Sequence, residues 1–127
     1  MTTVRDVMST DLVTVAPSDT MLVVAGRMAA AHVGSVLVLE DGVLVAILTE
    51  RDILRALGTS ASADAARVSA VATWMTAMPE TIEPDAPAGD ALDRMLSGGF
   101  RHLPVIDGDA VLGVISIRDL AKALSKE

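Results

Sequence analysis

The sequence predicts a mixed α/β fold of the α+β type, in which two pseudo-twofold-related β-α-β-β-α repeats pack sheet to sheet. Three observations predict it: an ungapped internal repeat at an offset of 67 residues, the same order of strand and helix patterns in both copies, and a content of 51% hydrophobic residues. One copy of about 55 residues buries too little surface to be stably folded alone. We therefore expect the two copies to form one module.

The repeat divides the chain into two copies joined by a short connection. Residues 4–57 align without a gap with residues 71–124 and share eleven identities over 54 positions, more than chance gives for this composition. The stretch 58–67 is small and polar, as surface linkers are. The expected divisions are repeat 1 in residues 1–60, a linker in 61–70 and repeat 2 in 71–127.

Each copy is expected to begin with a short extended segment and a helix. Leu12–Val15 and Glu80–Ile82 are each followed, two residues later, by a proline that favours a turn. The helix of the first copy, Met21–His32, can be capped by Asp19 or Thr20. Because this helix is apolar nearly all round, we expect it to be buried on more than one side.

Each copy continues with a β-hairpin that leads directly into a second helix. Asp41-Gly42 is a strong two-residue hairpin signal, and residues 107–109 occupy the same place in the second copy. Thr49 and Ser116 stand at the N-cap position of the helices. The predicted elements are strands Ser35–Leu39 and Val43–Thr49 with helix Glu50–Leu57, and strands His102–Ile106 and Val111–Ser116 with helix Ile117–Leu124.

The junction between the last strand and the last helix carries one motif twice. The pattern Gly-x-x-Thr/Ser-x-x-Asp is complete over residues 113–119, whereas residues 46–52 have Ala46 in place of the glycine. Unpaired N–H groups at a helix N-terminus attract anions, and the hydroxyls of Thr49 and Ser116 add donors beside them. This combination favours a phosphate group.

The motif aspartates and the strand residues before them extend this interpretation to a nucleotide. The carboxylates of Asp52 and Asp119 can each accept two hydrogen bonds, which suits the vicinal hydroxyls of a ribose. Ile47 and Val114 offer an apolar wall for a flat base. Thr or Ser followed three residues later by Asp is also an ordinary helix cap that needs no ligand. Both interpretations stay open at this point.

The repeat and the doubled motif resemble the cystathionine-β-synthase (CBS) domain family, specifically the standalone tandem pair called a Bateman module. The middle strands add Val36-Leu37-Val38 and Leu103-Pro104-Val105 to this resemblance. It implies a regulatory ligand that contains adenosine, bound in the cleft between the repeats: AMP, ADP or ATP, and more rarely S-adenosylmethionine or NAD. It implies no cofactor that the protein requires.

The resemblance also implies that each site draws on both copies, and the two sites are expected to differ. Arg101 and His102 would complete the first-copy site, where Arg101 would meet a phosphate; without a ligand they are exposed charges at a strand end. The second-copy site has no evident cation and would hold adenosine with its phosphates towards solvent, or stay empty. The expected ligand-binding residues are Ile47, Thr49, Asp52, Arg101 and His102 at the first site, and Val33, Gly34, Ser35, Val114, Ser116 and Asp119 at the second, with Ser9–Val13 nearby.

Several classes of function are excluded by composition. The net charge of −7 is spread evenly over both halves, so no basic face is expected for nucleic acid. The absence of Cys and of any apolar run near 18 to 20 residues favours a cytoplasmic protein outside the membrane. His32 and His102 are the only histidines, and no catalytic motif accompanies them, so we expect neither an enzyme nor a metal site.

The sequence has more apolar residues than a small single chain easily buries, which predicts that chains associate. Met21–Ala31 and Val68–Met75 are nearly continuous apolar segments, which favours a homodimer held by these segments, with Val24 and Met28 as positions to test by substitution with Glu. A bound ligand would be read by a separate effector protein of unknown identity. The alternative function is a dimerisation or protein-interaction module that works without a ligand.

Overall fold

The computed structural model describes residues 1–126, and the chain forms two compact units. The first, here called the central unit, is the continuous stretch Val13–Pro79. The second, here called the terminal unit, combines Met1–Leu12 with the chain from Glu80 onward. Neither unit coincides with one copy of the repeat, because the opening segment of each copy lies in the unit built on the other copy.

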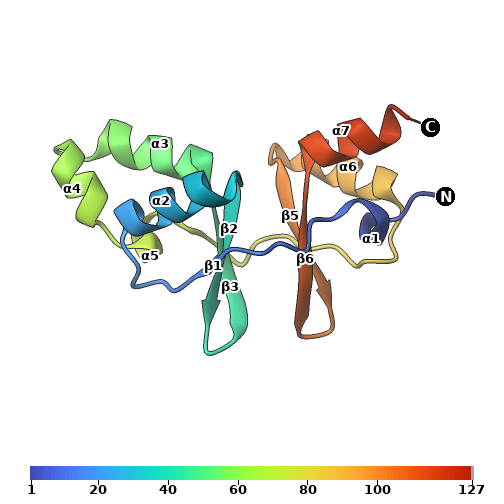
Figure 1. Cartoon of the computed structure of the whole chain (residues 1–127), viewed down its shortest axis with the longest axis horizontal. Coiled ribbons are helices and arrows are strands. Elements are labelled where there is room, and N and C mark those ends of the chain that lie inside the picture. The colour runs from blue at the N-terminus through green and yellow to red at the C-terminus, as the bar shows by residue number, and fades with distance from the viewer. Residues whose placement is uncertain (127) are drawn as a thin grey trace. The chain divides into compact units, whose positions relative to one another are not determined.

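The central unit contains a four-stranded sheet in the order β1-β2-β3-β4. β1 is parallel to β2, and the other neighbouring strands are antiparallel. Figure 1 shows the helices of this unit gathered on one side of the β2–β3 hairpin. Its elements are β1 (Thr14–Val15), α2 (Met21–Ala31), β2 (Ser35–Glu40), β3 (Val43–Thr49), α3 (Glu50–Thr59), α4 (Ala63–Val68), α5 (Val71–Trp74) and β4 (Thr76–Ala77).

The terminal unit repeats this plan around the antiparallel hairpin β5–β6. Single bridges replace the short edge strands: Ile82 pairs in parallel with Val105, and Ser9 pairs antiparallel with Val114. These four residues therefore give the same strand order that the central unit shows. The elements are α1 (Val4–Val7), α6 (Ala88–Gly98), β5 (His102–Asp107), β6 (Ala110–Ser116) and α7 (Ile117–Leu124).

The hairpins and the helices that follow them lie where the sequence predicts them. Asp41 and Gly42 have φ of 53° and 78°, the left-handed conformation that a tight two-residue turn requires. α3 and α7 begin at the predicted residues, although α3 continues two residues beyond Leu57 to Thr59. The expected linker contains a helix, α4, in which the Ser62 hydroxyl accepts the N–H of Ala65 at 3.0 Å.

The prediction that the first long helix is buried on more than one side is wrong for the chain alone. Val24 and Met28 of α2 are buried in the core, whereas Leu22 and Val23 are 57% and 51% exposed. Thr20 is the N-cap, since its hydroxyl accepts the Val23 N–H at 3.3 Å. The helix therefore has one inward face, and its opposite face presents apolar side chains to solvent.

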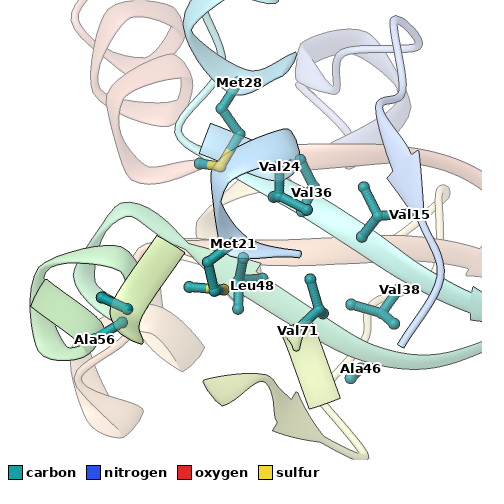
Figure 2. Close-up of a cluster of buried hydrophobic side chains, with 11 residues drawn as sticks. Val15, Met21, Val24, Met28, Val36, Val38, Ala46, Leu48, Ala56 and Val71 are labelled. Atoms are coloured by element: carbon teal, nitrogen blue, oxygen red, sulfur yellow. The ribbon is translucent and has the colours of Figure 1, made fainter. Parts of the chain in front are cut away.

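The buried side chains form two clusters, one in each unit. In the central unit, alternate residues of β2 and β3 point towards the helices, so that Val36, Val38 and Leu48 pack against Val24 (Figure 2). In the terminal unit, Leu103, Val105 and Ile115 occupy the equivalent positions. The intervening strand residues consequently point to the other face of each sheet. Among the described residues, no helix is long and apolar enough to cross a membrane.

In each copy one arginine of the long helix forms a hydrogen bond with the short extended segment before it. Arg27 Nη1 donates to the carbonyl oxygen of Thr14 at 2.9 Å, and Arg94 Nη1 donates to that of Thr81 at 2.8 Å. Both the arginines and the threonines are identical between the copies. The repeat therefore preserves a structural contact at these positions.

The glycine that begins the second motif is required by a close backbone approach. Ser9 and Val114 exchange two backbone hydrogen bonds, of 2.8 and 3.0 Å. A Cβ added to Gly113 would lie 2.5 Å from the Ser9 carbonyl oxygen and 3.0 Å from Met8 Sδ. At the same place in the central unit, Ala46 pairs with Ala77 of β4. The Gly-to-Ala difference between the motifs thus follows from how closely the edge segment passes.

Gly113→Ala should therefore destabilise the protein by about 1 to 3 kcal/mol, because the Ser9 backbone must shift to admit a methyl group. Gly26→Ala is the matched control, since a Cβ on this exposed residue of α2 meets no atom within 4 Å. That control should stabilise by about 0.4 to 1 kcal/mol. Urea unfolding measures both changes, and equal effects would contradict the close approach.

Candidate functional site

The structure places the candidate ligand residues of each unit on neighbouring strands. In the central unit Ser35 pairs with Thr49, directly across the β2–β3 ladder. In the terminal unit His102 pairs with Ser116 in the same way. Ile47 and Val114 each lie two residues earlier on their strands, on the sheet face that points away from the helices. The expectation that residues of both copies complete each site stays a prediction.

Some backbone N–H groups at the N-termini of α3 and α7 already donate hydrogen bonds to the protein itself. The first N–H of α3, from Glu50, donates to the carbonyl oxygen of Gly34 at 3.1 Å. In the same way, the Ile117 N–H donates to the carbonyl oxygen of Arg101 at 2.9 Å. A phosphate at these helix starts would therefore meet fewer free N–H groups than the sequence suggested. Gly34 and Arg101 thus have a backbone role in addition to any contact with a ligand.

In the central unit the motif aspartate is fully engaged within the protein. Asp52 is 4% exposed, and its Oδ2 accepts the backbone N–H of Thr49 at 2.9 Å. The Thr49 hydroxyl lies 3.4 Å from the same oxygen. Oδ1 accepts a hydrogen bond from Arg55 Nη1 at 2.7 Å. Helix capping and an ion pair thus occupy both oxygens of this carboxylate.

The motif aspartate of the terminal unit has a different arrangement. The Ser116 hydroxyl accepts the backbone N–H of Asp119 at 3.1 Å, so the cap is made by the serine. The Asp119 carboxylate is half-buried and accepts no hydrogen bond from residues 1–126. Both its oxygens are therefore available to hydroxyl groups of a ligand, and the Ser116 hydroxyl can still donate its own proton.

A third Thr-x-x-Asp segment shows that this cap by itself does not identify a ligand site. Thr3 donates its backbone N–H to Asp6 Oδ2 at 2.9 Å and its hydroxyl to the same oxygen at 3.1 Å, at the start of the four-residue helix α1. The backbone hydrogen bond from Thr3 lowers the pKa of the Asp6 carboxyl below its usual value. Asp6 and Asp52 thus each cap the helix that begins beside them, and Asp119 is the motif carboxylate that capping does not use.

The remaining candidate residues lie at the edges of the hairpins. Arg101 is exposed, and its guanidinium makes no ion pair within the part of the chain that is described. His102 and Val33 are half-buried. Ser9 lies against Val114 in the terminal unit. No cluster of three or more potential metal ligands occurs among the described residues.

Sequence reasoning missed the side chains that hold Asp52. The guanidinium carbon of Arg55 lies 5.7 Å from the centroid of the Trp74 ring, close enough for a cation–π contact. The spacing of Asp52 and Arg55, three residues apart on a helix, is a local signal that could have indicated the ion pair. The contact with Trp74 has no such signal, because α5 follows only after the intervening α4.

The comparisons with known proteins show the family. The model of the CBS domain matches residues 4–59 and again residues 68–126. The chain is 34% identical, over 95% of its length and 84% of the relative's, to the CBS domain-containing protein YhcV of Bacillus subtilis. A CBS-domain protein of Agrobacterium tumefaciens, ATU1752, has a crystal structure that matches with a TM-score of 0.88 and 32% identity, covering 96% of this chain and 92% of that one. The chain therefore belongs to the CBS domain family and is a tandem pair of CBS domains, a type of regulatory module.

Two more distant structures of the same fold were solved with adenosine compounds. CBSX2 in complex with AMP matches with a TM-score of 0.81 and 23% identity, over 98% of this chain and 96% of that one. The CBS pair of MJ0100, in complex with 5′-methylthioadenosine and S-adenosylmethionine, matches with a TM-score of 0.88 and 21% identity, over 98% and 97%. At these identities the likeness establishes the fold.

The two motif aspartates should differ in what they contribute to stability. Asp52→Ala removes two hydrogen bonds of a buried carboxylate and should lower the free energy of unfolding by about 1.5 to 3 kcal/mol. Asp119→Ala removes only a favourable charge at a helix N-terminus, about 0.3 to 1 kcal/mol. Urea unfolding of the two variants checks this difference. A larger loss for Asp119→Ala would contradict the hydrogen bonding described above.

Proposed function

We propose that this CBS pair is a sensor that binds an adenosine-containing ligand at its strand-to-helix motifs and signals to a separate effector protein. The ligand is AMP, ADP or ATP, with S-adenosylmethionine and NAD as the less favoured candidates. The observation that carries the proposal is the Asp119 carboxylate, which is half-buried at a helix start and accepts no hydrogen bond from residues 1–126. The proposal also holds that the protein is cytoplasmic and is not an enzyme.

The chemistry of the terminal unit suits a nucleoside. Asp119 can accept both vicinal hydroxyls of a ribose, and Ser116 can donate to a ribose or phosphate oxygen. Val114, on the same strand and two residues before Ser116, presents an apolar side chain that a base can contact. Arg101, an exposed cation, is expected at the phosphates of a nucleotide in the first-copy site, not in this one.

The comparison structures support the choice of ligand. AMP is bound by CBSX2, and 5′-methylthioadenosine and S-adenosylmethionine are bound by the pair of MJ0100. These ligands share an adenosine-like part and differ in what is attached to the 5′ carbon. These structures support an adenosine-containing ligand because the same fold binds the nucleoside in both proteins. The experiment below tests which group is attached to it.

A thermal-shift measurement tests the sensor function. A ligand that binds only the folded state adds about 2.7 kcal/mol at a hundredfold excess over Kd. At roughly 3 to 6 °C per kcal/mol for a chain of this length, the midpoint should rise by about 8 to 16 °C. AMP, ADP, ATP, S-adenosylmethionine and NAD are each added at millimolar concentration.

GTP and sulfate serve as controls in the same measurement, because a bare anion at the helix starts could imitate phosphate binding. Mass spectrometry of the purified protein shows whether a nucleotide already occupies the sites. The sensor proposal fails if no adenosine compound raises the midpoint and no nucleotide co-purifies.

An apolar patch on the helices favours the second candidate function, an interaction module that dimerises. Leu22 of α2, Leu54 and Leu57 of α3, and Val68 of α4 are 57%, 69%, 51% and 73% exposed. α4 packs against both α2 and α3, so these side chains belong to adjoining helices of the central unit. Such a patch is typical of a surface that a partner covers, and we propose a homodimer through it.

Leu22→Glu should convert the dimer into a folded monomer, because it places a charge on the exposed face of α2. Light scattering at micromolar concentration measures the mass, and circular dichroism verifies folding. Val24→Glu and Met28→Glu, the substitutions suggested by sequence alone, are unsuitable, since both residues are buried in the core and a charge there unfolds the unit. A monomeric wild type would rule out this interface.

A further inference from the structure

Asp52, the first motif aspartate, forms a connected group with the side chains of Arg55 and Trp74 in the central unit. Arg55 Nη1 donates to Asp52 Oδ1 at 2.7 Å, and the same guanidinium lies 5.7 Å from the centre of the Trp74 ring. Trp74 Nε1 donates to the Ser69 hydroxyl at 2.9 Å, which in turn donates to the Ala66 carbonyl oxygen at 2.6 Å. The group therefore links the start of α3 to α5 and to the end of α4. We call Asp52, Arg55 and Trp74 the aspartate latch.

The terminal unit has no counterpart of this latch. At the offset of 67 residues, Arg55 corresponds to Lys122 and Trp74 corresponds to Val7. Lys122 makes no ion pair with any of residues 1–126, and Val7 offers no ring to stack on a cation. The carboxylate of Asp119 stays open for this reason. The two copies thus share the motif and differ in what lies beside its aspartate.

We propose that the aspartate latch withholds the first motif from ligand, so that the resting chain binds one ribose-bearing ligand, through Asp119, and a second only when Arg55 leaves Asp52. This inference rests on the sensor function proposed above. A ribose hydroxyl must reach an acceptor oxygen, and the Asp52 side chain is 6% exposed, with the Thr49 N–H on one oxygen and the Arg55 guanidinium on the other. Arg55 is half-exposed, so it can swing into solvent while the cap from Thr49 remains.

Opening of the latch would be transmitted to a neighbouring element. Trp74 is the last residue of α5, and β4 follows two residues later along the edge of β3. When Arg55 leaves Asp52, it also loses its position over the Trp74 ring. Ligand at the first motif therefore alters the surroundings of α5. Trp74 is the only tryptophan of the chain, so its fluorescence reports the state of the latch.

The experiment compares Arg55→Gln with its matched control Lys122→Gln in the full chain, with AMP as the probe. Calorimetry counts the AMP molecules bound, and Trp74 emission is followed during the same titration. We expect one AMP per chain in the wild type and in Lys122→Gln, and the same emission from both before AMP is added. In Arg55→Gln we expect two, and the Trp74 emission should already differ from that of the wild type before AMP is added, because no cation lies over the ring. Asp119→Asn in the wild-type background should reduce affinity by about tenfold or more, and Asp52→Asn should not.

Two equivalent AMP sites in the wild type, or one site in Arg55→Gln, would overturn the latch while leaving the sensor function intact. Absence of AMP binding in every variant would instead count against the sensor function for this ligand. The latch is then decided without ligand by urea unfolding of Asp52→Asn, Arg55→Gln and the double variant. Additive effects overturn the latch, and a clear coupling between the two substitutions supports it.

Discussion

The arrangement of both units depends on covering the outer edge of each hairpin. β3 and β6 are the second strands of their hairpins, and an uncovered edge would leave a row of unpaired N–H and C=O groups. β4, from the start of the second copy, pairs with β3, and Ser9, from the start of the first copy, pairs with β6. Each unit is therefore completed by a segment that belongs, in sequence, to the other copy. Neither copy has its full set of backbone partners without this exchange.

The exchange also explains why the two motifs are not equivalent. The edge segment brings a different short helix to each unit, α5 with Trp74 to the central one and α1 with Val7 to the terminal one. Trp74 stacks with the cation that holds Asp52, and Ser9 approaches the backbone at Gly113 so closely that a side chain does not fit. The differences between the copies at these positions follow from which segment lies beside the motif. A repeat that looks uniform in sequence therefore contains one engaged carboxylate and one open carboxylate.

The helices of the central unit have apolar side chains both in the core and on the exposed surface. One face of α2 supplies Val24 and Met28 to the core of the central unit, and its other face exposes Leu22 and Val23. A small unit cannot bury every apolar residue of such a composition. Much of the surplus lies on the helices, whereas Ile47 and Val114 lie on the other face of the sheets. Ligand binding and association with a partner can thus use separate surfaces of the same unit.

Local signals in the sequence determined the repeat, the hairpin turn at Asp41-Gly42, the helix starts after Thr49 and Ser116, and the membership in the CBS family. The turn and the helix starts depend on residues a few positions apart, where backbone conformation and capping are decided, and the repeat and the family follow from comparing whole segments of the sequence. The hydrogen-bond partners of Asp52, Thr49 and Arg55, are likewise local, each three residues away. Tertiary structure alone decided three further points: which copy receives each opening segment, which face of α2 is buried, and that Trp74 lies against Arg55. These depend on contacts between residues far apart in the chain, such as Arg55 with Trp74 and Gly113 with Ser9. Periodicity and motif spacing contain no information on such contacts, because both describe only the order of neighbours along one segment.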